Sequence, residues 1–478
     1  MKLHITFALS LALLLVSCAP KPAPVVSPTA IPSQPPTQAP TEVPIITQFP
    51  MSPPPPTVSP VATWSMPTLD PVIANGQEPP PCTFPLAQIT ATESVPENYT
   101  FSEPKDVIVA LEGNEYNVAG WLPGDQQILV TENLHNQYVE NNNTVSQQAI
   151  SLYNLDTGKS KVYAMRANSY EPPIWQPDIN GVVYSTLNYT NIDRKNGVYK
   201  FTRQLWISYG NPDAAQLLAD NLTQFPLAIN PVGSEIIFLS DKQISKLQKS
   251  LKVIPAISFD PTQWDYARSR RDNQPVSYQM AWQPGTSLIL LFSEGGFSFQ
   301  GGYAFILDTS TGSICELNLG GPVDRVVRWS SDGRYMAIAR ATSYTGFSDS
   351  EDLVIFDSNT GNLRTVNVVP QDVIGKHFVT DITWTPDNLH LLVLENIPST
   401  YDPHDFKTLH HELYFVDLIS NKSIQLFPEF KSFFGNGIPG MNNFVWSPDG
   451  SKLLIRCPVM QGNGIDRFCL ISIHKHMK

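Results

Sequence analysis

The densest group of residues that could do chemistry lies between residues 402 and 412. The sequence DPHDF starts at Asp402 and supplies His404 and Asp405, and HHE starts at His410 and supplies His411. Carboxylates and imidazoles are common metal ligands and common general acids or bases. However, the chain has no His-Glu-x-x-His motif and no other loop with an obvious set of partner ligands. We therefore expect a polar hairpin tip here and no cofactor, with a metal site as the alternative built from Asp402, His404, Asp405 and His411.

Other motifs resemble known sites only superficially. Gly435 to Gly440 match G-x-G-x-x-G, but a strand is expected after them and Pro439 would disturb the start of a phosphate-binding helix. No G-x-S-x-G nucleophile elbow is present. The sequence therefore offers no recognisable catalytic signature.

The chain has five cysteines, and no two form a C-x-x-C pair. Cys457 and Cys469 fall in successive expected strands, where they could form a disulfide across a hairpin. The alternative is that both are buried as small apolar side chains. An exported protein can keep such a disulfide.

The first 18 residues have the features of an export signal. Lys2 supplies a positive charge, residues 5–16 are mostly apolar, and LVSC ends at Cys18. The apolar run is too short to span a membrane as a stable helix. The LVSC sequence resembles the lipobox of bacterial lipoproteins, which implies that Cys18 is acylated and becomes the new N-terminus; an ordinary signal peptide is the alternative. We therefore expect an extracytoplasmic protein, lipid-anchored to the cell membrane or the outer membrane of a bacterium.

Residues 19–96 have the composition of a disordered linker. Of the 43 prolines in the chain, 22 lie between Pro20 and Pro96. Such a segment cannot bury a core, and its prolines favour extended polyproline II geometry. At ~3.1 Å per residue it could hold a domain on the order of 100–200 Å from a membrane.

The remaining residues, 97–478, contain a repeated pattern. A tryptophan is followed by a turn rich in Ser, Pro, Asp and Gly and then by an apolar strand, as in VWSPDGSKLLI at Val445. The pattern occurs seven times, and Ile229 replaces the tryptophan in the third copy. The anchor residues are Trp121, Trp175, Ile229, Trp282, Trp329, Trp384 and Trp446. Two further strands follow most copies, and four short antiparallel strands per repeat predict a β-propeller.

The repeat resembles the WD40-like repeats of TolB-type propellers. We expect seven blades, or six if the third copy, at Ile229, is only a spacer. The last repeat lacks a fourth strand, and an extra strand at 106–111 precedes the first repeat. We expect this extra strand to pair with residues 468–473, which would close the ring and cover two sheet edges.

Long connections between the second and third strands of each repeat should gather on one face of the ring. Exposed loops on a rigid scaffold are common recognition sites. The expected binding residues are Tyr138, Tyr189, Phe297, Tyr344, Tyr401 and His404. The alternative is that these side chains are solvated or pack on each other.

Charge narrows the range of partners. The formal net charge is −12 and no Lys/Arg cluster of the kind that would form a basic face appears, which argues against a nucleic-acid partner. The expected function is that of a cell-envelope lipoprotein that binds an envelope protein or an extracellular ligand, with the lipid anchor as its only contact with the membrane. The alternative function is an extracytoplasmic hydrolase or lyase with its site on the long-loop face.

Overall fold

The computed structural model describes 79–87, 89, 97–109, 115–140, 143–167, 172–193, 198–222, 228–229, 235–240, 243–248, 251–258, 278–293, 304–320, 323–341, 351–369, 377–398, 409–428, 444–457 and 467–477. All of these residues belong to the unit Trp64–Lys478. Within them, no helix combines the length and hydropathy that a membrane span requires. The lipidation candidate, Cys18, lies outside the described residues.

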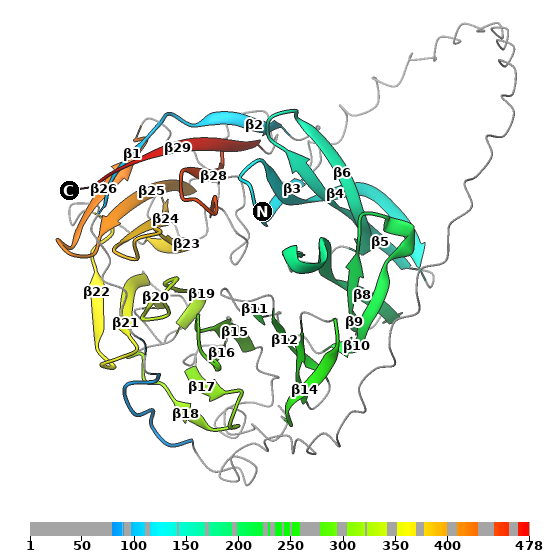
Figure 1. The fold of residues 1–478 in the computed structure, drawn as a ribbon, viewed down its shortest axis with the longest axis horizontal. Coiled ribbons are helices and arrows are strands. Elements are labelled where there is room, and N and C mark those ends of the chain that lie inside the picture. Colours follow the sequence, from blue (N-terminus) through cyan, green and yellow to red (C-terminus); the bar gives the residue numbers. More distant parts are fainter. Residues whose placement is uncertain are drawn as a thin grey trace, which may run out of the picture. The chain divides into compact units, whose positions relative to one another are not determined.

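The described strands form six sheets, arranged around a common centre as a β-propeller (Figure 1). Neighbouring strands are antiparallel, and in four of the sheets the four strands follow chain order. The strands of these four sheets are β3 (Glu115–Trp121), β4 (Gln127–Glu140), β5 (Asn143–Asn154) and β6 (Lys159–Ala167); β15 (Tyr278–Trp282), β16 (Leu288–Ser293), β17 (Ala304–Asp308) and β18 (Ile314–Glu316); β19 (Val323–Trp329), β20 (Tyr335–Ala341), β21 (Glu351–Asp357) and β22 (Leu363–Val366); and β23 (Phe378–Trp384), β24 (His390–Pro398), β25 (Leu409–Asp417) and β26 (Lys422–Leu426).

The fifth sheet contains eight strands and corrects the expected number of blades. Its strands are β7 (Ile174–Gln176), β8 (Gly181–Asp193), β9 (Val198–Ser208), β10 (Gln216–Leu222), β11 (Ala228–Ile229), β12 (Ile236–Ser240), β13 (Gln243–Leu247) and β14 (Val253–Ser258), with short 3₁₀ helices at Pro177–Ile179 and Pro212–Ala214. Leu222 of β10 pairs with Ser240 of β12, which joins the second and third repeats. Seven separate blades are therefore not supported, and the six-blade alternative is. The third repeat is not a spacer, however, because Ile229 pairs with Ile236.

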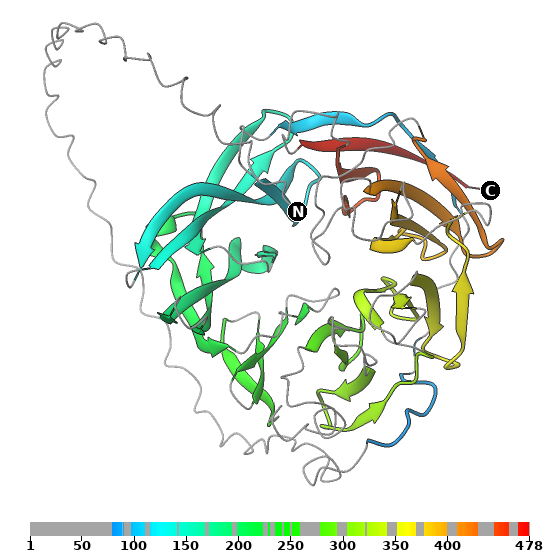
Figure 2. The ribbon, with the colours of Figure 1, turned by 180° about the vertical axis from the view of Figure 1, so that it is seen from behind.

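The sixth sheet closes the ring with strands from both ends of the propeller. It contains β27 (Phe444–Trp446), β28 (Lys452–Arg456) and β29 (Arg467–Met477), and β2 (Lys105–Val109) pairs with β29. The register aligns Asp106 with Cys469, which confirms the expected pairing of these two segments. An additional strand, β1 (Glu97–Phe101), pairs with the other end of β29 (Figures 1 and 2).

Aromatic packing explains why β1 joins this sheet. The Tyr99 ring lies 5.7 Å from Phe415 and 6.3 Å from Trp446, and Phe101 lies 5.3 Å from Phe415. Aromatic pairs at these distances add stabilisation beyond the area that they bury. The N-terminal strand is thus fixed to two neighbouring sheets.

Residues 79–87, which the sequence assigned to the linker, contact the outer strands of two sheets. Cys82 and Cys315 of β18 form a disulfide, and the Cys82 N–H donates to the Glu316 carbonyl (2.9 Å). Further along, the Leu86 N–H donates to the Ser358 carbonyl (3.0 Å), and the Phe84 ring packs edge-on against Phe356. In Figures 1 and 2 this segment, drawn in blue, runs beside β18 and β22.

The repeated turn has a defined hydrogen-bond pattern. In the last copy Ser447 Oγ donates to Asp449 Oδ1 (2.6 Å), which also accepts the Ser451 N–H (2.8 Å), while the Lys452 N–H donates to Ser447 Oγ (2.9 Å). The same three bonds recur at Ser330–Asp332 and at Thr385–Asp387. The Ser/Thr and Asp of the motif therefore hold the first hairpin of these three sheets.

The tryptophan of the motif can join neighbouring sheets. Trp384 Nε1 donates to the carbonyl of Arg328 (2.8 Å), and Trp121 Nε1 donates to that of Val445 (2.9 Å). Each acceptor residue directly precedes the tryptophan of the preceding sheet. The second bond connects the first repeat to the last, so the same tryptophan-to-carbonyl bond is also made where the ring closes.

Turns of neighbouring sheets also bond to each other. These bonds join Gln283 Nε2 to the Gly333 carbonyl (2.7 Å), the Ser331 N–H to Asn388 Oδ1 (2.9 Å) and Lys452 Nζ to the Asp125 carbonyl (3.0 Å). The turn end of the sheets is therefore engaged in holding the ring together.

Candidate functional site

Most of the residues predicted for binding or catalysis lie outside what the structure describes. This holds for Phe297, Tyr344, Tyr401, Asp402, His404 and Asp405. Tyr138 of β4 pairs with Val145 of β5, and Tyr189 of β8 pairs with Phe201 of β9. The backbone at both positions therefore belongs to an extended hairpin and not to the long loop that was expected, because the strands continue past the turn that the sequence indicated. His411 is buried on β25, with 6% of its surface exposed.

The sheet β23–β26 contains a pair of titratable side chains that the sequence did not single out. The pair lies at the end of the sheet where the long connection between β24 and β25 begins. His377, just before β23, places its Nδ1 3.3 Å from Oε2 of Glu395 on β24. Glu395 is completely buried, while His377 keeps 28% of its side chain exposed. His377 is therefore the solvent-accessible end of a pair whose other member is inside the protein.

The second oxygen of the Glu395 carboxyl group, Oε1, is buried without a hydrogen-bond partner among the described residues. Such a group carries a desolvation cost that no bond offsets. A charged carboxylate would carry a much larger cost than a protonated one. The environment therefore favours a proton on Glu395.

A second carboxyl group lies across the sheet from Glu395. The register pairs Glu395 of β24 with Glu412 of β25. The Tyr414 hydroxyl donates to Glu412 Oε2. Directly opposed acidic side chains repel each other when both are charged, so Glu412 also favours the neutral form of Glu395.

Both members of the pair have shifted pKa values. Burial raises the pKa of Glu395 above its ordinary value, against the opposing effect of His377. The hydrogen bond with Glu395 raises the pKa of His377, although burial acts in the opposite direction. Shifted pKa values in both partners are typical of groups that exchange protons, and such groups gather at functional sites.

The neighbouring sheet contributes an ion pair to this region. Arg340 Nη2 lies 3.2 Å from Asp352 Oδ2, and the charge of Asp352 also raises the pKa of His377. The site, defined as His377, Glu395, Glu412, Arg340 and Asp352, therefore spans two neighbouring sheets.

The topology places this site at the long-loop end. β24 ends at Pro398, which pairs with Leu409 at the start of β25. The connection between them carries Asp402, His404 and Asp405. The sequence pattern indicated this connection but not Glu395, whose one signal was an acidic residue directly after the apolar run Leu391–Leu394.

These five residues do not form a compact metal-ligating group. In the ranges that the structure describes, the group of three such ligands that lies within 4.8 Å is Asp106, Cys457 and Cys469, in the sixth sheet. The His377–Glu395 pair is thus better suited to proton transfer or hydrogen bonding than to metal binding.

Comparison with known proteins gives only distant structural similarities. No family model and no curated protein matches the sequence. Similar solved structures include TolB from Acinetobacter baumannii, with 14% identity, a TM-score of 0.33 and coverage of 58% of this chain and 59% of TolB. An oligogalacturonate lyase from Vibrio parahaemolyticus has 9% identity, a TM-score of 0.46 and coverage of 79% and 97%. The C-terminal WD40 domain of Sif2 has 11% identity, a TM-score of 0.39 and coverage of 77% and 98%.

The observed sheets and repeated turns define the chain as a β-propeller protein. It spans only 59% of the TolB structure that it matches. Because these identities and TM-scores are low, no activity is transferred from these structures.

Proposed function

We propose that this chain is a lipid-anchored, extracytoplasmic β-propeller that binds a protein or another ligand through the long-loop end of its sheets. The observation that supports this most is the difference between the two ends. Turn-to-turn bonds occupy one end, whereas the other end carries the partly exposed His377 of a buried proton-sharing pair.

The two disulfides support the extracytoplasmic location. Cys82 bonds to Cys315, and Cys457 bonds to Cys469. Disulfides of this kind persist in oxidising compartments and are rare in the cytosol. The first disulfide also fastens residues 79–87 to the outer edge of β18, so a tether that ends there would leave the long-loop end uncovered.

Site-specific photo-crosslinking in the intact envelope tests the binding proposal. A photoreactive residue replaces Tyr138 or Tyr189 on the long-loop side, or exposed Asp156 or Ser310 on the turn side, in the full chain. We expect adducts from the first pair and none from the second. Adducts confined to Asp156 and Ser310 would show that binding uses the other face.

Lipidation is tested separately. The chain is expected to incorporate labelled palmitate, and Cys18→Ser should abolish the incorporation. Label that survives this substitution contradicts a lipid on Cys18.

The second candidate function is a hydrolase or lyase that acts on extracellular glycans. The specific observation in its favour is the His377–Glu395 pair, because a buried acid with a raised pKa beside an imidazole can act in general acid–base catalysis. Assays on a panel of polysaccharides should then show turnover that Glu395→Gln abolishes and that the exposed control His476→Ala leaves unchanged. Turnover that is unaffected by Glu395→Gln would exclude this pair from catalysis.

A further inference from the structure

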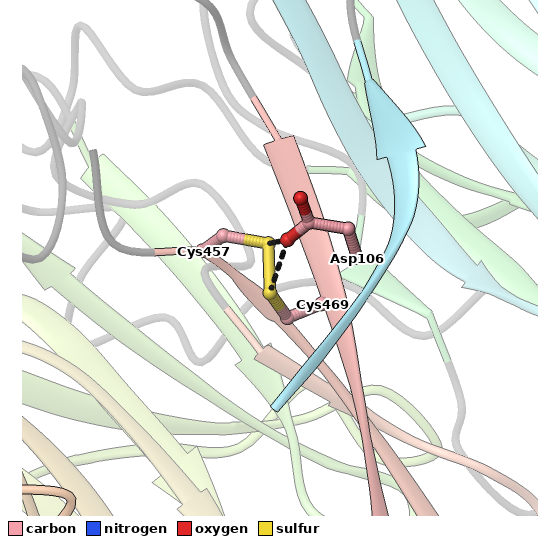
Figure 3. Close-up of side chains that lie close together, drawn as sticks. All are labelled: Asp106, Cys457 and Cys469. Carbon is pink, nitrogen blue, oxygen red and sulfur yellow. Dashed lines mark hydrogen bonds between the residues drawn. A yellow bond between two sulfur atoms is a disulfide. The ribbon is translucent and has the colours of Figure 1, made fainter. Parts of the chain in front are cut away.

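Three metal-ligand atoms converge where the ring closes. The Asp106 Oδ1 atom of β2 lies 3.4 Å from Sγ of Cys457 and 3.3 Å from Sγ of Cys469 (Figure 3). Cys457 directly follows β28 and Cys469 lies in β29, and both are at most 2% exposed. In the oxidised protein the two sulfur atoms are bonded to each other, so neither is a thiolate.

The carboxylate is held in place from its other side. Arg467 Nη1 lies 3.1 Å from Asp106 Oδ2, which leaves Oδ1 facing the sulfurs. The Asp106 side chain is 47% exposed, so the group is open to solvent on the side of β2. An ion therefore has an approach to the sulfurs that does not cross the core.

We propose that reduction of the Cys457–Cys469 disulfide creates a zinc-binding site formed by these two thiolates and Asp106. Two Cys thiolates and a carboxylate are suitable ligands for Zn²⁺, and a water molecule would complete a tetrahedron. With the ion, these ligands carry a net charge of −1, which the guanidinium of Arg467 offsets.

The chemistry balances with a phosphine as the reductant. The phosphine and one water molecule convert the disulfide into two thiols, and the phosphine becomes a phosphine oxide. Zn²⁺ then binds both sulfurs, and the two thiol protons pass to solvent.

Metal and disulfide would have different effects on the ring. The disulfide joins β28 to β29, which already form one hairpin. The zinc site would in addition bind β2, which comes from the other end of the propeller. The reduced, metal-bound form thus gains a direct link between the N-terminal and C-terminal parts of the sixth sheet.

Cobalt(II) is a spectroscopic probe for this site because its thiolate complexes absorb in the near ultraviolet. The full chain with Cys18→Ser, Cys82→Ser and Cys315→Ser keeps Cys457 and Cys469 as its only cysteines. After phosphine reduction we expect one cobalt per chain, a thiolate–cobalt band, and displacement of cobalt by one equivalent of zinc. The same chain left oxidised should show no band.

Asp106 provides the matched comparison. Asp106→Asn should weaken zinc binding by about 10-fold or more, because it removes a charged ligand. Glu103→Ala, an exposed change between β1 and β2, should leave the affinity unchanged. Equal affinity of Asp106→Asn and the parent chain, or a missing cobalt band while both thiols react with a thiol reagent, would overturn the proposal.

Folding is followed by circular dichroism in the same samples. If the reduced, metal-free chain loses its sheet signal, stoichiometric zinc is expected to restore it. A reduced chain that stays unfolded with zinc would also overturn the proposal.

Discussion

The two ends of the sheets place buried carboxyl groups in opposite environments. At the turn end, Asp387 is only 8% exposed, and its carboxylate contacts the Thr385 hydroxyl (2.5 Å), the Leu389 N–H (3.0 Å) and the His390 ring (3.0 Å). Burial alone would raise the pKa of Asp387, but these hydrogen bonds have the larger combined effect, so the pKa is lowered. At the loop end, one oxygen of Glu395 has no donor in the part of the chain that the structure describes, and burial raises the pKa of this carboxyl group.

This difference shows how similar sheets serve two purposes. Where donors saturate an acid, the acid is a structural part of the turn and stays charged. Where the donors are too few, the acid keeps a proton at a pH at which an exposed carboxyl has lost it, and it can exchange that proton with a neighbour. The turn end therefore maintains the ring, and the loop end retains a pair of groups that can exchange a proton.

The largest effect is expected from replacing Asp387. Asp387→Asn removes the charge and puts an amide donor where an acceptor is needed, so the free energy of unfolding should fall by about 1–3 kcal/mol. Urea unfolding at pH 7 measures this loss. The matched change at the loop end, Glu395→Gln, should cost less than about 1 kcal/mol; an equal or larger cost would remove the contrast between the two ends.

An intermediate effect is expected from the tryptophans at the turn end. Trp384→Phe removes the Nε1 bond to the neighbouring sheet and should destabilise the protein by about 1 kcal/mol beyond the loss of ring volume. Trp329 is the control, because its buried Nε1 has no acceptor among the described residues. Thermal unfolding of the two variants compares them, and a Trp329→Phe variant that is as destabilised as Trp384→Phe would argue against a structural role for this bond.

The sequence predicted the repeat and the ring closure because both depend on local patterns. Turn residues and alternating apolar strands recur in each copy, and the missing last strand has a counterpart near Asp106. The number of sheets was not predictable in this way. The contact between Leu222 and Ser240 that joins two repeats is a single pairing with no sequence signature.

Long-range contacts at the N-terminus were also beyond the sequence. Cys82 and Cys315 are 233 residues apart, and nothing in the spacing of the cysteines indicates their bond. Strand β1 depends on the packing of Tyr99 against Phe415 of the neighbouring sheet and Trp446 of its own sheet. Similarly, the partner of Glu395 could not be predicted, because His377 lies 18 residues earlier in the chain, just before β23.

The smallest and most diagnostic effects concern pH. The hydrogen bonds from Ser447 and Ser451 lower the pKa of Asp449 to about 2, from an ordinary value of 3.8. Its stabilising contribution is therefore present above pH 3.8 and is lost as the pH falls toward 2. Burial raises the pKa of Glu395 above 4.5, so its contribution is present below pH 4.5 and is lost as the pH rises through the raised value. The pKa of His377 is also raised, so its stabilising contribution is present below pH 6.5 and is lost as the pH rises through the raised value.

The free energy of unfolding as a function of pH, measured for the wild type, Asp449→Asn and Glu395→Gln, tests the contrast between the two ends most directly. The advantage of the wild type over Asp449→Asn should disappear as the pH falls from 4 toward 2. Glu395→Gln should gain stability relative to the wild type as the pH rises above 4.5. A difference between Glu395→Gln and the wild type that stays constant with pH, or that increasingly favours the wild type as the pH rises, would contradict this contrast.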